Sequence, residues 1–546
     1  STFNNDGGTV TDNGNFAIGY GTSTTGVVTQ TGGSVIAAAL QFGPGTGTYN
    51  LNGGTLTVAD ITYTNAATQH FNFDGGTLQA DGALNTTLPI MVTAGGGTVD
   101  TNGNGVTLGG ELTTSGTLTK VGTGVLTVSG SVNLGGNAGF TSNNDKIVLS
   151  GAVNVGTHQL TIDGAGDVEK TGSFSIASGG ELLKTGSGTL VLAGQNLGGG
   201  ATYTHQDGML DTSDFRLGYG GTATLQQNGG TIDAQTYFIV GGGTAAGSKG
   251  VYNLSGGQLD VHGRLYCAWQ ADGEINQTGG TVTAANLDSA TDGGNGVYNL
   301  RGGLLTVNGI ANLGYKYTTD FTQSGGTASF GELNLGGRAG AGTANYTINT
   351  DDGASQMTIR AGGALNVGYG NNGTGSLNVD GGTVTVNADM YLGLNGNAHG
   401  TVTQTGGTVT IDPAHGLRFR CTGAFTGTYN LNGGTLTLAA IDYTNASTQH
   451  FNFGGGTLQA NGALTTSMPM TINAGGATVD TNGNTVTFNG GNLSGTGGLT
   501  KIGAGDLVLN GAHTFGGDAL AIAGRLLVEG SISGDATVDG GFLGGG

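Results

Sequence analysis

The chain has 546 residues, with 35 acidic and 15 basic side chains and a formal net charge of -20. This balance argues against a protein that follows nucleic-acid phosphates, because that class needs clustered lysine and arginine. Its 118 glycines do not recur at every third residue, and it has only 4 prolines, which excludes collagen. Aliphatic and aromatic residues instead recur at every second position, which is typical of β-strands and not of a disordered chain.

The first section, residues 1–130, contains short alternating runs separated by Gly-Gly pairs near residues 32, 53, 75 and 95. We predict a strand on each side of every pair, because glycine is favoured in turns and costs roughly 0.5–1 kcal/mol relative to alanine inside a strand. The text of residues 47–108 returns nearly unchanged at 427–488. Such similarity within one chain indicates the duplication of a block of several repeat units.

The second section, residues 131–210, is predicted as irregular coils, and a lysine-containing phrase frames it. The phrase reads LTKVGTGVLTVSG at 118–130, LLKTGSGTLVLAG at 182–194 and LTKIGAGDLVLNG at 499–511. We interpret it as an apolar strand face, a Gly-x-Gly bend and a further strand. The lysine before each bend (Lys120, Lys184 and Lys501) is expected to point outward.

This phrase resembles the autotransporter-associated β-strand repeat of secreted bacterial passenger regions and related large surface proteins. The third copy continues through 512–538, with His513 and Phe515 where the longer family motif has Asn and Tyr. The resemblance implies a parallel β-helix that is secreted and displayed on a bacterial surface. It also supports a right-handed coil, which parallel connections generally prefer.

The third section, residues 211–426, is a regular array of the Gly-Gly phrase. A further strand ending in an aliphatic residue and glycine recurs within it, at 215–220, 311–315, 365–370 and 390–394. Three strands per unit, repeating every 20–29 residues, favour coils in which each strand pairs with its equivalent one coil along. We therefore predict an all-β fold: one right-handed parallel β-helix, or β-solenoid, over residues 1–546, with about 25 coils. Residues 427–546 then hold the second copy of the first block and a terminal autotransporter-type repeat.

The predicted core consists of aliphatic ladders, such as Val384 and Val386 stacked over Val409 and Ile411. Burial at about 25 cal/mol per Å² in every coil supports such a fold without disulfides or metal. Cys267 and Cys421 continue apolar alternations and are expected to be small buried residues. They lie several coils apart, too far for a disulfide within the chain.

The sequence predicts no catalytic, cofactor-binding or metal-binding residues. It lacks a Gly-x-Ser-x-Gly elbow, an HExxH helix, a CxxC pair and a P-loop. Asp351 and Asp352 resemble the paired carboxylates of β-helical polysaccharide hydrolases. Those enzymes also need Gly-His-Gly and Arg-x-Lys, whereas His399 and His415 follow alanine and 417–421 contains no lysine. We therefore expect the aspartates to form a solvated corner.

Three further patterns have a structural and a functional interpretation. His70 and His450 occupy identical QHFNF runs, in which the phenylalanines would face inward and each histidine outward, alone. The DTNGN segments at 100–104 and 480–484 supply one carboxylate each, so we expect a corner and not a calcium loop. Four tyrosines follow the aliphatic-glycine element and predict either a corner ladder or a sugar-binding stripe. They are Tyr20, Tyr219, Tyr315 and Tyr369.

These observations predict an extracellular structural or adhesive β-solenoid of a bacterial surface or fibre, and not an enzyme. The alternative is a polysaccharide lyase or glycoside hydrolase built on the same coil. Neither 1–10 nor 537–546 resembles the polar cap of a solenoid, so we expect end-to-end self-association or a longer parent chain. Surface glycans are the candidate ligands, and nucleic acid is not. The sequence contains no run of about 20 apolar residues, so we predict no membrane insertion by this segment. We expect that any secretion signal has already been removed or lies outside this segment.

Overall fold

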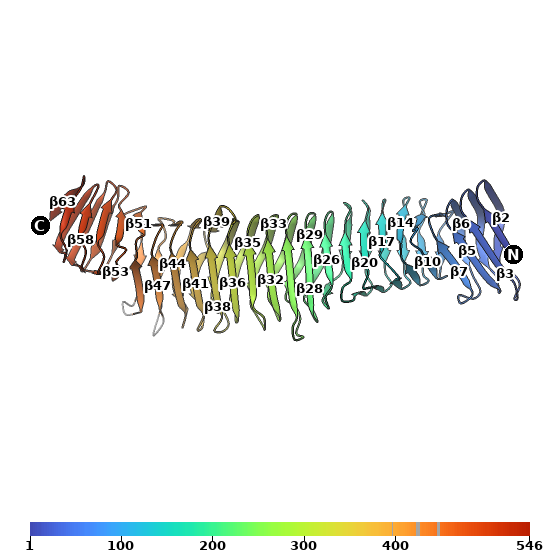
Figure 1. The fold of residues 1–546 in the computed structure, drawn as a ribbon, viewed down its shortest axis with the longest axis horizontal. Coiled ribbons are helices and arrows are strands. Elements are labelled where there is room, and N and C mark those ends of the chain that lie inside the picture. Colours follow the sequence, from blue (N-terminus) through green and yellow to red (C-terminus); the bar gives the residue numbers. More distant parts are fainter. Residues whose placement is uncertain (396, 422–425, 445–447, 546) are drawn as a thin grey trace. The chain divides into compact units, whose positions relative to one another are not determined.

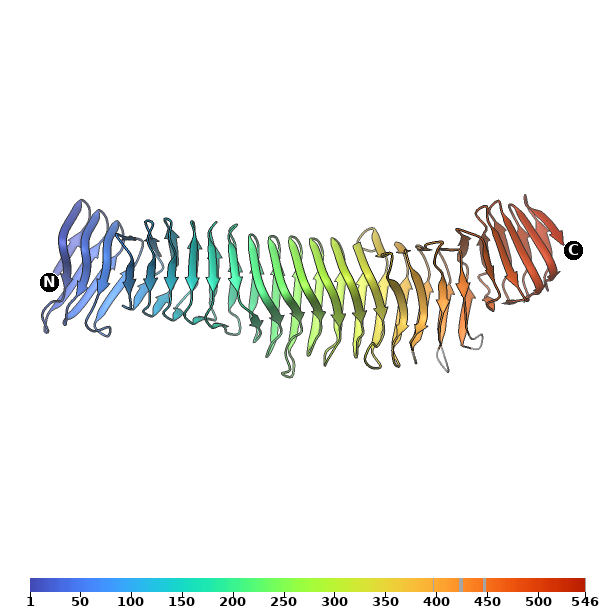
Figure 2. The same cartoon turned by 180° about the vertical axis from the view of Figure 1, so that it is seen from behind.

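The computed structural model describes residues 1–395, 397–421, 426–444 and 448–545, which form strands, turns and bends and no helix. The fold is a parallel β-solenoid of about 24 turns, which confirms the predicted fold class. Two compact units are distinguished: unit 1 is Ser1–Thr236 with Ser255–Asp260, and unit 2 is Tyr237–Leu254 with Val261–Gly546. Within each unit, successive coils stack with their strands side by side (Figure 1, Figure 2).

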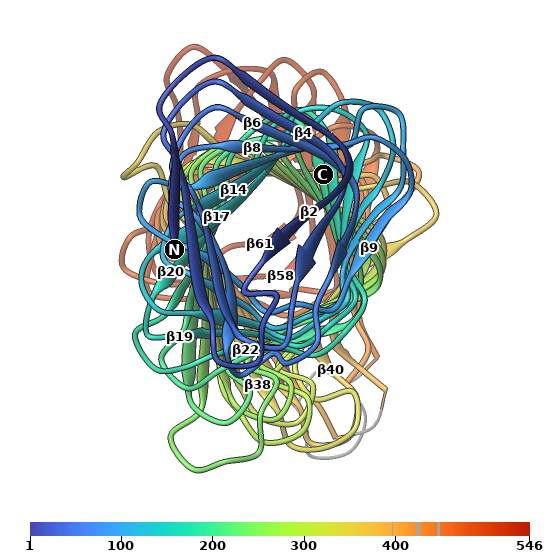
Figure 3. The same ribbon diagram turned by 90° about the vertical axis from the view of Figure 1, so that its right-hand side faces the viewer.

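In unit 1 nine strands, one from each of nine coils, form a parallel sheet. Its order begins with β1 (Thr2–Asn5), β3 (Thr25–Gln30), β5 (Thr46–Leu51), β7 (Gln69–Phe73), β10 (Ile90–Val92) and β13 (Leu112–Thr114), and continues through β16 (Val132–Leu134), β19 (Val153–Gly156) and β22 (Phe174–Ile176). The view along the coils shows the nearest strands of this unit surrounding its interior (Figure 3). Tyr49 pairs with Phe71 in register, and their buried rings stack at 5.6 Å. Equivalent side chains of successive coils therefore stack on one another in the core, as the alternation predicts.

The coils differ in how the chain continues after the Gly-Gly corner. In some coils one long strand follows: β4 (Ser34–Phe42), β33 (Thr281–Ser289), β35 (Leu304–Leu313) and β37 (Gly326–Leu335). In others two short strands follow: β42 (Thr383–Val386) with β43 (Asp389–Leu394), and β45 (Thr408–Ile411) with β46 (Leu417–Phe419). The prediction of three separate strands per unit is thus wrong for β33, β35 and β37. There a bulge, at Val307–Ile310 in β35, bends the strand without interrupting its pairing.

The predicted core ladders are confirmed. Val384 pairs with Val409 and Val386 with Ile411, and all four side chains are fully buried. Both cysteines are buried and free, as expected. Burial raises the pKa of the Cys267 thiol to about 12, so this sulfur is an inert core atom.

The Gly-Gly corners require a left-handed backbone conformation without a Cβ atom, and their carbonyl oxygens require hydrogen-bond donors. Gly407 has φ +62°, and a Cβ there would lie 2.5 Å from the carbonyl oxygen of Gly382. The corner carbonyls point inward, where Gln404 donates from Nε2 to Gly407 O at 3.3 Å and to Thr435 O at 2.9 Å. The Tyr429 hydroxyl donates to the other end of this amide, Oε1, at 2.7 Å. We call the inward residue just before a glycine corner the corner residue.

The same arrangement recurs in several other coils in which the Gly-Gly phrase carries glutamine. The buried glutamine-tyrosine pairs are Gln30 with Tyr49, Gln277 with Tyr298, and Gln323 with Tyr346. The duplicated block likewise repeats its contacts: Gln79 donates to Asp100, and Gln459 to Asp480, both at 2.8 Å. The DTNGN segments form corners, because Asn102 and Asn482 both adopt φ +47°.

A carboxylate in the core ladder is expected to destabilise the solenoid. We expect Val409→Asp to lower the free energy of unfolding by about 3 kcal/mol or more, since an unpaired charge would be buried. The control Thr410→Asp, on the outward side of the same strand, should cost less than about 1 kcal/mol. Denaturant unfolding measures both variants, and equal losses would contradict the assigned strand faces.

Candidate functional site

The carboxylate pair suggested by the sequence lies on an exposed corner. The Asp352 carboxylate accepts a hydrogen bond from the Ser324 hydroxyl and lies 4.0 Å from Nε of Arg301. The Asp351 backbone N–H donates to the Asn349 side chain at 3.2 Å. Both aspartate side chains are exposed to solvent. The expectation of a solvated corner is therefore confirmed.

The histidines of the duplicated block point outward, as predicted. His70 and His450 are exposed, whereas Phe71 and Phe73 beside His70 are fully buried. Among the described residues, no group of three or more His, Cys, Asp or Glu side chains could hold a metal ion. Within the same residues, no helical segment could span a membrane.

The four tyrosines after the aliphatic-glycine element do not form a continuous row. Tyr20 and Tyr219, in unit 1, are 70% and 50% exposed. In unit 2, Leu313 pairs with Leu335 and Leu335 with Val367. This register places Gly337 between the coils of Tyr315 and Tyr369, so these two rings cannot stack on one another.

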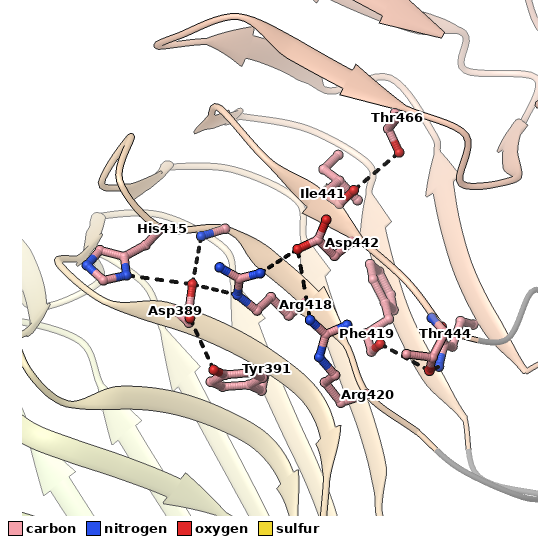
Figure 4. A network of polar contacts seen from close by, with 12 residues as sticks. Asp389, Tyr391, His415, Arg418, Phe419, Arg420, Ile441, Asp442, Thr444 and Thr466 are labelled. Atoms are coloured by element: carbon pink, nitrogen blue, oxygen red, sulfur yellow. Dashed lines mark hydrogen bonds and ion pairs between the residues drawn. The ribbon is translucent and has the colours of Figure 1, made fainter. Parts of the chain in front are cut away.

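A polar network that the sequence did not predict lies on the outward face of three consecutive coils in unit 2 (Figure 4). Tyr391 of β43 pairs with Arg418 of β46, and Arg418 pairs with Asp442 of β49 (Ile441–Asp442). We call the six residues of this network the charged cluster. They are Asp389, Tyr391, His415, Arg418, Arg420 and Asp442.

Arg418 joins the two carboxylates of the charged cluster. Its Nε lies 2.7 Å from Oδ1 of Asp389, and its Nη1 donates to Asp442. Arg420 approaches Asp442 at 3.9 Å, and Nδ1 of His415 lies 3.6 Å from Asp389. The cluster therefore ties three coils together through two ion-paired carboxylates.

The electrostatics of Asp389 suit an ion pair and not a general acid. Burial alone would raise the pKa of Asp389. Hydrogen bonds from Arg418, from the Gly416 backbone N–H and from the Tyr391 hydroxyl, with the charge of Arg418, hold it below its ordinary value. A general acid needs a raised pKa, so this carboxylate cannot supply a proton near neutral pH.

His415 and residues 417–421 drew attention in the sequence, but Asp389 and Asp442 did not. The two aspartates lie on the preceding and following coils, and only the register places them against Arg418. His399 is held elsewhere: its Nδ1 lies 2.9 Å from the Thr426 hydroxyl. The charged cluster could have been predicted by comparing the outward-facing residues in the last strand of successive coils.

The lysines of the repeated lysine-containing phrase point inward, so the expectation of outward lysines is wrong. Lys120 and Lys501 are fully buried, and Lys184 is 1% exposed. The alternation that buries Leu118 also places Lys120, two residues later, on the inward face. Each lysine is a corner residue.

Each ammonium group is surrounded by corner carbonyls. Nζ of Lys120 donates to Gly122 O and to Asn144 O, both at 2.7 Å. Nζ of Lys501 lies 2.7 Å from Gly503 O and 2.8–2.9 Å from Ile502 O, Ala523 O and the Thr481 hydroxyl, so four oxygens surround its three N–H groups. The inward carbonyls of a tight corner need a donor, and lysine supplies three N–H groups.

Lysine, histidine and glutamine replace one another at this position. In unit 1 the register pairs Lys184 with His205, and His205 with Gln227. His205 lies 2.8 Å from the Tyr203 hydroxyl of its own strand through Nδ1, whereas the corner glutamines contact a tyrosine of the next coil. Burial, and then the charge of Lys184, lower the pKa of His205 to about 4, so this imidazole is neutral at pH 7.

Comparison of the chain with known protein families, with curated proteins and with solved structures finds no match.

Removal of a corner ammonium is expected to destabilise the terminal repeat. Lys501→Met should cost about 2–4 kcal/mol of unfolding free energy, because buried carbonyls lose their donor. Lys501→Gln should cost less, since glutamine fills the corner in other coils. Chemical denaturation compares the two, and an equal or larger loss in the glutamine variant would refute the shared role.

The corner lysines also predict a dependence of stability on pH. Burial lowers the pKa of Lys184 to about 8, against an ordinary value of 10.5. Between these values the unfolded chain binds more protons, so the free energy of unfolding should rise as pH rises from about 8 to about 10. The rise should be smaller in Lys184→Met. Parallel pH slopes in the two proteins would show that Lys184 does not titrate in this window.

Proposed function

We propose that the chain is an extracellular structural or adhesive solenoid of a bacterial surface. The observation that carries the proposal is the repetition of uncharged ladders on the outward faces. In unit 2, Asn276 donates to Asn253 at 2.9 Å and Asn299 donates to Asn276 at 2.8 Å. Such ladders stabilise long stacks of coils without creating a pocket.

The proposed location rests on the autotransporter-type phrase. Its three copies keep the lysine, the Gly-x-Gly bend and the following aliphatic strand. The corner geometry gives these anchor positions a physical reason, because they form one hydrogen-bonded unit. The net charge of -20 suits a repetitive surface that must resist non-specific association. We further propose that coils continue end to end, either in a longer parent chain or through self-association.

A polysaccharide lyase or hydrolase is the second candidate. The observation in its favour is the charged cluster, which gathers His415, Arg418 and Arg420 on neighbouring coils. Arginines of this kind can bind the carboxylates of acidic glycans. Against it, Arg418 already pairs with two aspartates of the protein, and Asp389 is held ionised.

Two measurements on the producing cells and the purified chain separate these functions. We expect antibody labelling of intact cells to detect the protein, and external protease to remove that signal. Incubation with polygalacturonate should release no oligosaccharides, because Arg418 keeps the pKa of Asp389 below its ordinary value and so prevents this carboxyl from acting as the acid. Labelling only after permeabilisation would contradict the proposed location. Oligosaccharide release that is lost in Arg418→Met would instead establish the enzyme.

A further inference from the structure

Three aromatic rings lie together on the surface of unit 2, apart from the charged cluster. The Tyr237 and Tyr266 ring centroids are 6.0 Å apart, and those of Tyr266 and Trp269 are 5.7 Å apart. Tyr266 and Trp269 are nearly parallel, with 27° between their ring planes. Tyr237 is 39% exposed, and the other two side chains are partly exposed. We call these three residues the aromatic platform.

The backbone that carries Trp269 is fixed. Ala268 adopts φ +69°, a left-handed conformation that is costly for a residue with a Cβ. The corresponding residue of the next coil is again alanine, Ala290 with φ +59°, and in later coils it is glycine, such as Gly314 and Gly368. The backbone N–H of Ala268 donates to Val240 O at 2.7 Å, and that of Trp269 to Gly241 O at 3.1 Å. The indole is thus presented from a turn held by the preceding coil.

The platform carries no unbalanced charge. The Arg264 guanidinium carbon lies 5.9 Å from the Tyr266 ring centroid. Its Nη1 lies 2.7 Å from Oδ2 of Asp288, whose side chain is 2% exposed. Asn312 donates to the other oxygen of this carboxylate at 2.7 Å. The arginine is therefore neutralised by a buried partner and is committed to the protein.

We propose that the aromatic platform binds a neutral polysaccharide. Pyranose rings present flat C–H faces, which pack on the faces of tyrosine and tryptophan, and a row of rings suits a chain of sugars. An acidic glycan would find Arg264 already paired and a chain of net charge -20, so charge favours an uncharged polymer. A protein partner would also need a wider apolar surface than these three rings provide.

Trp269 is the only tryptophan of the chain, so its fluorescence reports on the platform directly. The full chain is titrated with cellohexaose, laminarihexaose, mannohexaose and chitohexaose, with polygalacturonate as the acidic probe. We expect a saturable change with at least one neutral oligosaccharide and none with polygalacturonate. Tyr237→Ala and Tyr266→Ala should each weaken that binding by about tenfold.

The matched control is Tyr219→Ala, which removes an exposed tyrosine outside the platform and should leave binding unchanged. Circular dichroism and the Tm of each variant establish that the fold is kept. Tyr237→Ala is the decisive variant, because Tyr266 also packs against Arg264. The proposal is overturned by no saturable change with any neutral probe, by a response to polygalacturonate alone, or by equal affinities in Tyr237→Ala and Tyr219→Ala. None of these results bears on whether the protein lies at the cell surface, so the two proposals fail separately.

Discussion

The solenoid depends on satisfying the backbone carbonyls that its tight glycine corners turn inward. Gln277 pairs with Leu254 of the coil before and Leu300 of the coil after, so the donor does not recur in every coil. One amide can serve two corners, as Gln404 does when it donates to Gly407 O and to Thr435 O. Loss of such a donor would leave buried oxygens unpaired, each at a cost of about 1–3 kcal/mol. Lys184, His205 and Gln227 occupy equivalent places in three successive coils, although their charges differ. What these side chains share is a polar group long enough to reach the corner from the strand before it. Two phrases that look unrelated in sequence are therefore two solutions of one hydrogen-bonding problem.

The corner residues place no constraint on the outward-facing side chains of the strand segment that ends each coil, so those side chains can vary. In unit 2 one column of such side chains, one from each successive coil, begins at Asp288. It continues with the amides of Asn312, Asn334 and Asn366, which are buried, and each amide donates a hydrogen bond to the member of the column in the preceding coil. Tyr391 and Arg418 occupy the same column in the following coils and belong to the charged cluster. The aromatic platform lies at the other end, where Arg264 contacts Asp288. The buried amides, the charged cluster and the aromatic platform therefore lie along one edge of the solenoid in unit 2.

The charged groups of the lysine corners and of the charged cluster have opposite environments and opposite pKa shifts. Lys120 is enclosed by carbonyl dipoles, and burial lowers its pKa. Arg418 remains partly exposed, and its hydrogen bond to Asp389 raises its pKa. The first arrangement replaces an amide inside the core, whereas the second joins neighbouring coils from outside. Both arrangements therefore stabilise the stack of coils.

The sequence by itself determined the features that depend on local periodicity. Alternation identified the inward residues such as Val384 and Val409, the Gly-Gly pairs located the corners, and the repeated text revealed the duplicated block. Alternation also places Lys120 on the inward face, where Gly122 O and Asn144 O accept hydrogen bonds from its ammonium group, although we predicted that this lysine points outward.

Only the tertiary structure decided which outward residues meet, because the coils differ in length. Asn334 lies 22 residues after Asn312, whereas Asn366 lies 32 residues after Asn334. No fixed spacing could therefore bring Asp389 and Asp442 to Arg418, or set Tyr237 beside Tyr266. Contacts across coils are governed by the hydrogen-bonded register of parallel strands, and that register exists only once the coils have stacked.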